Sequence, residues 1–547
     1  MATLLSPAGA QTVYDRFFDE YYFPFNPTAA TFAGMHDYDG RLEDYSRAGV
    51  ERRVGALDGW LIDFGHEPPS SDRDIVLNYI RASKLELETI RMWERDPDRY
   101  SSGITSSAFS IMARKYSSPE KRLRSLIARE KAMPKVLADA RANLKNPPRI
   151  YTEIAIEQLP GNISFFESDI PLAFQDVKDK TLLAEFSASN AAVIAALREY
   201  QAWLTNTLLA LSTGDFRLGA ESFARKVLLE EMVDLPLERL LEIGYADLRA
   251  NQQRFRETAA RIDPSRPARQ VQAELQKDHP ANGAVLDAFR DSLDGLKQFI
   301  QEKRIVTIPS EVPPILQETP PFLRALTFAS MDTPGPYEKQ AKEAFFNVTL
   351  PEADWPAERI EEFLQGFHRG TILSTAVHEA YPGHYVQFLW MQQVPSKVRK
   401  LLGANSNAEG WAHYAEQMML DEGYGGDDAR IRLGQIQDAL LRNARYVVGI
   451  EMHTGKRSFE ESIKFFEEEG YQTHETAERE TKRGTSDPTY LYYTLGKLQI
   501  LKLREDYRRL KGSEFTLEEF HNRFMQEGFP PLKIVRQALL GDNGPTL

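Results

Sequence analysis

The seven-residue segment HEAYPGH, which begins at His378, contains the residue types of a zinc hydrolase. In the motif H-E-x-x-H, two histidines one helical turn apart bind Zn²⁺ and the adjacent glutamate activates a water molecule. Here the histidines are six residues apart, so on an undistorted helix they would lie on different faces. Pro382 lacks an amide N–H and its ring clashes with the carbonyl of His378, while Gly383 permits backbone angles closed to other residues. We therefore expect the helix to kink with a two-residue bulge that returns His384 to the metal, with Glu379 as the general base.

A second segment, EGWAHYAE at residues 409–416, carries two carboxylates seven residues apart on one helical face. A catalytic zinc site needs three protein ligands and an open position, and two histidines with one glutamate are a known set. We predict Glu409 as the third ligand and Glu416 as a carboxylate that orients a ligand histidine; a solvated position for Glu416 is the alternative. His413 would allow a different set of His378, Glu409 and His413, but that set leaves the Pro-Gly kink without a purpose. Taken alone, the first segment is better explained by a helix that ends at Tyr381, followed by a Pro-Gly turn, with two surface histidines; the second segment favours the metal site.

Five segments make the chain resemble a known family: HEAYPGHYVQ at 378–387, EGWAHYAE at 409–416, DPTYLYYTLGKLQILKLRED from 487, IYTEIAIEQ near 150 and GDFRLGAESF from 214. Through them the chain resembles the bacterial "domain of unknown function 885" family, whose members are similar to gluzincin metallopeptidases. The resemblance spans nearly the whole chain. It implies one Zn²⁺ per chain held by His378, His384 and Glu409, with Glu379 as the base. Tyr385 stands where the family often has a second histidine, a difference that affects the pocket and leaves the ligands in place.

Further side chains are candidates for contact with the substrate. Hydrolysis through a tetrahedral intermediate needs a donor to the oxyanion; Tyr493, in the place of a family tyrosine, is our first choice, and Tyr490 shares its helical face. His453, near the end of another helix, is a second catalytic candidate. Tyrosines at helical spacing are also common core residues, and a histidine at a helix C-terminus can be purely stabilising. Arg217 and Arg483 are candidates to bind a substrate carboxylate through the guanidinium fork, although either could be a surface group.

Long amphipathic helices dominate the elements that must position these residues. Apolar residues recur at three- and four-residue steps between residues 190 and 211, which is typical of one apolar helical face. Residues 118–144 are similarly helical and stop before a Pro-Pro pair. Residues 428–453 form a further long helix, closed by Gly455.

Strand signals are few and lie at residues 305–308 and 344–350, each followed by proline. The second strand could be an exposed edge that pairs with an extended peptide, with Asn347 among the substrate-binding residues, or it could be an internal strand. We predict a mainly α, large metallopeptidase-like fold with a small β-sheet beside the zinc-binding helices.

Chain length and composition suit one large enzyme with two helical lobes around a cleft. The chain has 547 residues, of which 42% are apolar and 27% charged, and a single core rarely grows beyond about 250–300 residues. We expect an N-terminal helical lobe at 11–308 and a catalytic lobe at 309–547, forming one continuous fold, with the Pro-rich residues 309–338 crossing between them.

The net charge of −13 argues against nucleic acid or anionic membranes as partners. No segment approaches the about 20 apolar residues of a membrane span, and the absence of cysteine excludes disulfides and thiol chemistry. Residues 1–10 read as a leader remnant or a disordered N-terminus. A leader would place the protein in the periplasm or outside the cell; otherwise it would be cytoplasmic.

These observations predict a zinc-dependent hydrolase that cleaves peptide bonds, as an exopeptidase on short peptides. A zinc-dependent amidase or esterase acting on a non-peptide substrate is an alternative. A non-catalytic scaffold derived from a peptidase fold is another, but it would have no need for Glu379 beside a metal ligand. The partner is thus a peptide or small amide, and the oligomeric state is left open.

Overall fold

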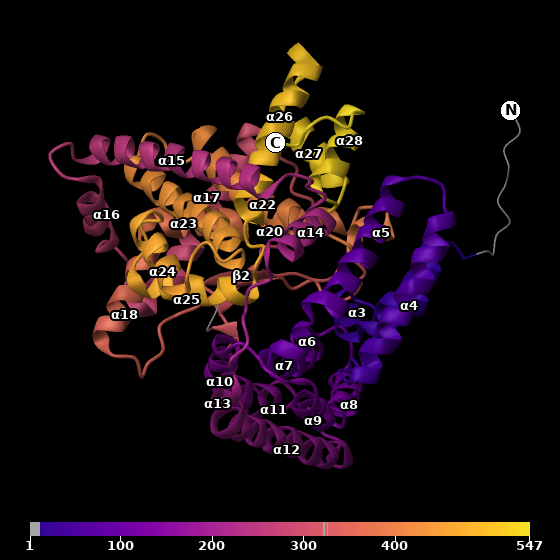
Figure 1. Cartoon of the computed structure of the whole chain (residues 1–547). Helices are drawn as coiled ribbons and strands as arrows, with labels where there is room; N and C mark the ends of the chain where they lie inside the picture. Colours follow the sequence, from indigo (N-terminus) through magenta and orange to yellow (C-terminus); the bar gives the residue numbers. More distant parts are fainter. Residues whose placement is uncertain (1–10, 321–322, 325–326) are drawn as a thin grey trace, which may run out of the picture.

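The computed structural model describes residues 11–320, 323–324 and 327–547, which form a mainly helical protein (Figure 1). The longest helices are α12 (Lys180–Trp203), α15 (Leu237–Ile262) and α23 (Ala429–His453). The mainly helical prediction is confirmed, and the predicted leader at 1–10 lies outside the described residues. In the described part of the chain, no helix combines the length and apolar character needed to cross a bilayer.

The N-terminal helices pack around two apolar cores in the lower right of Figure 1. They include α4 (Arg47–His66), α5 (Ser71–Lys84), α7 (Asp98–Met112), α8 (Pro119–Glu130), α9 (Met133–Asn143) and α10 (Arg149–Ser164). The segment predicted as one helix at 118–144 is therefore two helices, α8 and α9. Pro134 explains the break, because its ring would clash with the carbonyl of Glu130 in a continuous helix, whereas proline is tolerated in the first turn of α9.

The remaining helices carry the candidate site. They include α14 (Ala220–Glu231), α17 (Val285–Lys303), α18 (Ala357–Leu364), α19 (Arg369–Glu379), α20 (His384–Met391), α22 (Asn405–Asp421), α25 (His474–Ser486) and α26 (Tyr492–Lys511). Helix α23 ends at the predicted residue, and Gly455 follows it with a positive φ of 76°. Helix α15 packs against α23, α19 against α23, and α22 against α26.

Two glycine pairs let these helices approach backbone to backbone. A Cβ added at Gly410 of α22 would lie 2.5 Å from the Cα of Gly496 in α26. A Cβ added at Gly434 of α23 would lie 2.6 Å from the Cα of Gly370 in α19. Since real Cβ contacts are essentially never shorter than 3.0 Å, any side chain at these crossings would push apart the helices that carry the site.

A three-stranded mixed sheet lies beside these helices. Strands β1 (Ile315–Glu318), β2 (Ala329–Asp332) and β3 (Phe345–Val348) follow the order β1-β3-β2, with β1 parallel and β2 antiparallel to β3. The strand predicted at 344–350 is confirmed as β3. It is the central strand, so the possibility of an exposed edge is wrong for β3, and β2 is an edge instead.

The strand predicted at 305–308 is wrong, because this segment has no partner strand among the described residues. Side chains occupy its carbonyls: the carbonyl of Ile305 accepts from Nδ1 of His521, and that of Thr307 accepts from Nε1 of Trp390. Ile305 is buried in the core beside α17. Its apolar character thus reflects core packing of an irregular segment.

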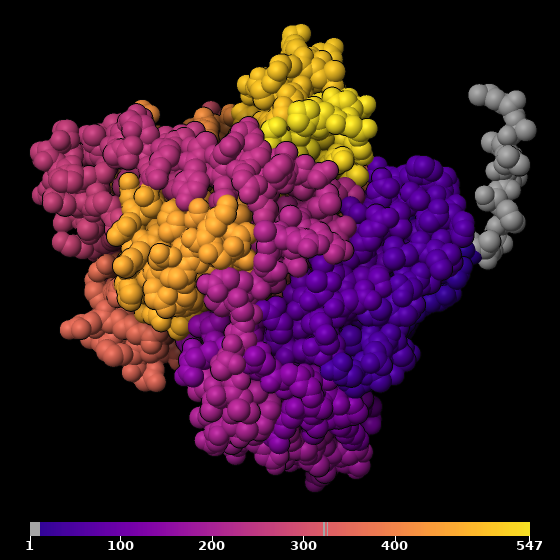
Figure 2. Space-filling view, in the orientation of Figure 1, coloured from indigo at the N-terminus to yellow at the C-terminus, as the bar shows by residue number. Residues whose placement is uncertain are grey.

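Figure 2 shows the indigo and purple N-terminal helices filling the lower right of the molecule and the magenta-to-yellow remainder filling the upper left. Helices α15 and α17 precede residue 308, yet they pack against α23 and α19, which follow it. Apolar residues of α17 share a core cluster with residues of α19, α20 and α22, and those of α15 share one with residues of α23. The lobe boundary at 308 stays a prediction, with continuous packing across it.

Candidate metal centre

Three side chains from three helices converge at the buried end of α19. His378 lies one residue before the end of α19, His384 begins α20, and Glu409 lies on α22. One ligand atom of each lies within 4.8 Å of the others. Oε2 of Glu409 is 3.2 Å from Nε2 of His378 and 3.3 Å from Nε2 of His384. The structure thus brings together the three predicted ligands, in a group that could hold a metal ion.

The junction between α19 and α20 explains how histidines six residues apart can meet. The expected kink is a complete break: α19 ends, four residues turn, and α20 begins at His384. The turn folds so closely onto α19 that a Cβ at Gly383 would lie 1.8 Å from the carbonyl oxygen of His378. Nε1 of Trp411, on α22, donates to the carbonyl of Pro382 at 2.8 Å. Glycine at 383 is therefore required, and the turn is hydrogen-bonded to the helix that carries Glu409.

Glu416 orients His378 from behind. Its Oε1 accepts from Nδ1 of His378 at 2.7 Å and from Arg442 at 3.0 Å, and its Oε2 accepts from Nδ1 of His413 at 3.1 Å. Burial opposes ionisation of Glu416, but Arg442 and His413 hold the pKa of this carboxyl well below its usual range. The contact of Nδ1 with Glu416 fixes the ring so that Nε2 of His378 faces Glu409, on the side where a metal ion would bind.

His413 lies outside the group of three potential ligands. Burial and the charge of Lys497 lower the pKa of His413 to about 3, so the ring is neutral. It is fully buried, and its Nδ1 contacts Glu416. The set of His378, Glu409 and His413 does not form among the described residues.

Glu379 is buried beside the ligand group. Burial raises the pKa of its carboxyl, while the nearby His378 and His384 act in the opposite direction. Its Oε2 is buried and has no hydrogen-bond partner among the described residues. Buried polar atoms without partners are rare in proteins. This oxygen is therefore available to a water molecule or ligand in the adjoining cavity.

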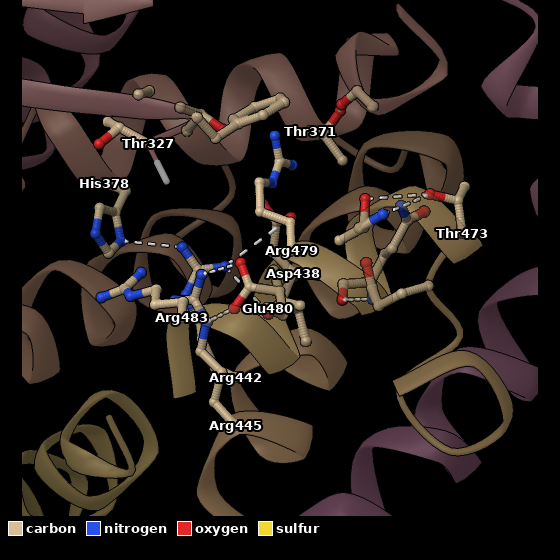
Figure 3. A pocket seen from close by; sticks show the side chains of 18 of the residues that line it. Thr327, Thr371, His378, Asp438, Arg442, Arg445, Thr473, Arg479, Glu480 and Arg483 are labelled. Carbon is tan, nitrogen blue, oxygen red and sulfur yellow. Dashed lines mark hydrogen bonds and ion pairs between the residues drawn. The ribbon is translucent and has the colours of Figure 1, made fainter. Parts of the chain in front are cut away.

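The cavity has a volume of about 480 Å³, and Figure 3 shows His378 at one side of it. His378, Glu379, Glu409 and Tyr493 line one part. The ring of Tyr493 is stacked on His378 at 6.2 Å between centroids, and its hydroxyl accepts from Arg483 at 3.1 Å. The structure thus places Tyr493 and Arg483, from the sequence candidates, in the same cavity as the ligand group.

Two other candidates lie elsewhere. His453 is fully buried, its Nε2 contacts the carbonyl of Gly484 at 2.7 Å, and burial lowers its pKa to about 4. Arg217 forms an ion pair with Asp215 at 3.3 Å. Neither residue lines the cavity in the described part of the chain. Their expected contact with the substrate is thus not supported: His453 is a core residue and Arg217 is part of a local ion pair.

Tyr490 and Asn347 are also absent from the cavity lining among the described residues. Tyr490 is fully buried and packs against Gly449 and Gly484. Asn347 is buried in β3, and its Oδ1 accepts from Gln317 of β1 at 2.9 Å. Tyr490 and Asn347, which the sequence suggested as substrate-binding residues, are therefore packed in the protein interior.

Sequence reasoning missed a group of charged residues along the cavity. Arg442 and Arg445 come from α23, and Arg479 and Glu480 from α25 (Figure 3). Arg445 makes a bidentate pair with Glu480, at 2.6 and 2.8 Å. The available signal was a pair of arginines three residues apart, Arg442 and Arg445, with the apolar runs 439–441 and 446–448 on either side, because buried arginines need partners.

Comparisons with known proteins support the fold. The chain is similar to a solved structure described as "a putative lipoprotein of unknown function from Shewanella oneidensis", with 26% identity, a TM-score of 0.79, and coverage of 97% of this chain and 100% of that chain. It also resembles a solved "putative lipoprotein from Colwellia psychrerythraea" (16% identity, TM-score 0.78, coverage 97% and 99%), a likeness that shows the fold alone. No curated protein sequence matches the chain. The family described as "Bacterial protein of unknown function (DUF885)" matches residues 27–539, so the chain belongs to the DUF885 family.

Proposed function

We propose that this protein is a zinc-dependent hydrolase that cleaves peptide bonds, as an exopeptidase on short peptides. One observation carries the proposal: a group of two histidines and a glutamate adjoins the buried Glu379, whose Oε2 has no hydrogen-bond partner among the described residues, and His378, Glu379 and Glu409 line one cavity. Metallohydrolases need these parts together, namely three protein ligands, a base that is not a ligand, and room for a substrate.

The residues present fit zinc. His378, His384 and Glu409 would hold the ion, a nitrogen and oxygen donor set that Zn²⁺ accepts. The Nδ1 donation from His378 to Glu416 resembles the carboxylate–histidine arrangement that orients zinc ligands. When bound, zinc acts as a Lewis acid that polarises a carbonyl and lowers the pKa of water.

The remaining groups supply proton transfer and orientation. Glu379 accepts a proton from the attacking water and passes it to the leaving amine. Tyr493 donates its hydroxyl proton to the oxygen that becomes negative. Arg483 supports this role, because it donates to the tyrosine oxygen and leaves the hydroxyl proton free for the substrate.

Two features favour a short peptide as the substrate. The cavity volume of about 480 Å³ lies within the about 300–1,000 Å³ of small-ligand sites. Ala329 and Ser330 of the edge strand β2 line the cavity, and an edge strand can pair with an extended backbone. The substrate-pairing role first considered for β3 therefore moves to β2.

Two separate substitutions of glutamate by glutamine test the proposal. Glu379→Gln should retain zinc. Its kcat should fall by about 10²–10⁴-fold, the contribution of general acid–base catalysis, with little change in KM. Glu409→Gln should lose zinc, because an amide oxygen is a poorer donor than a carboxylate. Zinc content is measured by plasma mass spectrometry, and cleavage of a mixed peptide library by peptide mass spectrometry. If neither substitution affects zinc or turnover, the proposal is wrong; cleavage restricted to non-peptide amides or esters would change the substrate class.

A further inference from the structure

Four arginines line the cavity beside the candidate metal centre, and one of them differs from the rest. Arg442 pairs with Glu416 at 3.0 Å, Arg445 with Glu480 and Arg483 with Asp487 at 3.0 Å. The fourth, Arg479, has no ion pair and no hydrogen bond with any of the described residues. It is thus the one cation of the described lining whose charge has no direct partner.

Glu480 and Glu475, the two carboxylates whose charge acts on Arg479, already pair with other arginines. Glu480 is held in the bidentate pair with Arg445, and Glu475 pairs with Arg359 at 2.9 Å. Burial lowers the pKa of Arg479, although guanidinium groups stay protonated in proteins. A half-buried cation without a partner is unfavourable, so an anion that enters the cavity would remove this cost.

Aromatic rings hold the guanidinium in the cavity. The Cζ of Arg479 lies 5.5 Å from the ring centroid of Phe363 and 5.9 Å from that of Phe328. Both rings also line the cavity. Figure 3 shows Arg479 extending past Glu480 toward the wall with Thr327 and Thr371. Ring contacts leave the N–H groups at the guanidinium edge free to donate.

We propose that Arg479 receives a carboxylate of the substrate in the cavity that the metal centre shares. Planar guanidinium and carboxylate groups match in a bidentate pair. The carboxylate comes from the C-terminus of a short peptide or from an acidic side chain. This role was first considered for Arg217 and Arg483, but Arg217 lies outside the cavity and Arg483 already holds Asp487. The inference rests on the proposed function for the peptide nature of the substrate.

Binding is measured by calorimetric titration of the full-length Glu379→Gln protein, with zinc and after its removal. The probes are trialanine, trialanine amide, and the amide of a tripeptide with two alanines and one glutamate. Trialanine or the glutamate-containing amide should bind about 10- to 150-fold more tightly than trialanine amide, the effect of one charged hydrogen-bonding pair. Adding Arg479→Gln should abolish the difference, and Arg479→Lys should retain part of it.

Lys482→Gln is the matched control, because it removes a cation from the same helix outside the described cavity lining. It should leave the preference unchanged. Tight binding of the glutamate-containing amide would identify an acidic side chain as the source, and binding of trialanine alone would identify the C-terminus.

Equal affinity for all three probes, no binding of any probe, or a preference that survives Arg479→Gln would overturn the inference. The proposed function fails separately: a protein without zinc or cleavage activity that keeps an Arg479-dependent preference refutes the hydrolase and leaves the carboxylate site standing.

Discussion

Gly383→Ala tests whether the turn between α19 and α20 builds the metal site. The added Cβ would lie 1.8 Å from the carbonyl oxygen of His378, 2.3 Å from that of Val377 and 2.4 Å from the carbonyl carbon of His378. All three atoms are backbone, so no rotamer change can relieve the clash. The turn and α19 must separate by at least about 1.2 Å, the difference between 1.8 Å and the 3.0 Å limit of real contacts. Zinc ligands tolerate deviations of only about 0.2 Å.

His384, the first residue of α20, directly follows the displaced turn and therefore moves away from His378. We expect zinc affinity to fall by about 10–100-fold or more, because the loss of one contact that supports a metal ligand already has an effect of this size. Affinity is measured by competition with a chromogenic chelator, and folding by circular dichroism. Gly366→Ala is the control, because Gly366 lines the same cavity and its added Cβ would approach Phe328 no closer than 3.4 Å. A folded Gly383→Ala protein with wild-type zinc affinity would refute the reasoning.

Three further predictions concern metal support, metal-linked stability and pH. Glu416→Gln should lower zinc affinity about 10–100-fold with the fold retained, since His378 loses its orienting carboxylate; unchanged affinity in the chelator assay would contradict this. Removing zinc with a chelator should lower the thermal midpoint, since a ligand that binds only the folded state stabilises it; an unchanged midpoint would count against a bound metal. Burial raises the pKa of Glu130, which accepts from Ser189, to about 8. The unfolded chain releases this proton near its usual pKa of about 4.3 while the folded protein keeps it, so stability should fall as the pH rises from about 5 to 8. Glu130→Gln should weaken this fall in urea unfolding midpoints, and an identical pH dependence would exclude Glu130 as a cause.

Local patterns predicted the ligand group well. His378, His384 and Glu409 lie in two short segments whose residue types and spacing are typical of metal ligands, and the structure brings them together in a group that could hold a metal ion. The Pro-Gly pair correctly marked a distortion of the helix, although it produces a full break. Helical periodicity also identified α12 and α23, because an amphipathic pattern reports the burial of one face.

Contacts between residues far apart in the chain could not be predicted from the sequence in the same way. Ile305 and its neighbours are apolar because they fill the core beside α17, while the short strands β1 and β2 form only through their register with β3. Likewise, whether His453 or Arg479 reaches the cavity depends on which helix face is turned inward, and the residue type does not determine this.

The glycine pairs at the crossings of α19 with α23 and of α22 with α26 have a consequence for how this protein tolerates change. Where side chains separate two helices, a substitution can be absorbed by repacking, and the helices shift by fractions of an ångström. At these four glycines the backbones meet directly, so no side chain at the closest approach can adjust to a change in the spacing of α19 from α23 or of α22 from α26. Apolar substitutions elsewhere in the core should therefore lower stability before they alter the distance between His378 and Glu409. The site can therefore tolerate substitutions at most surrounding positions, provided that Gly370, Gly410, Gly434 and Gly496 remain glycine.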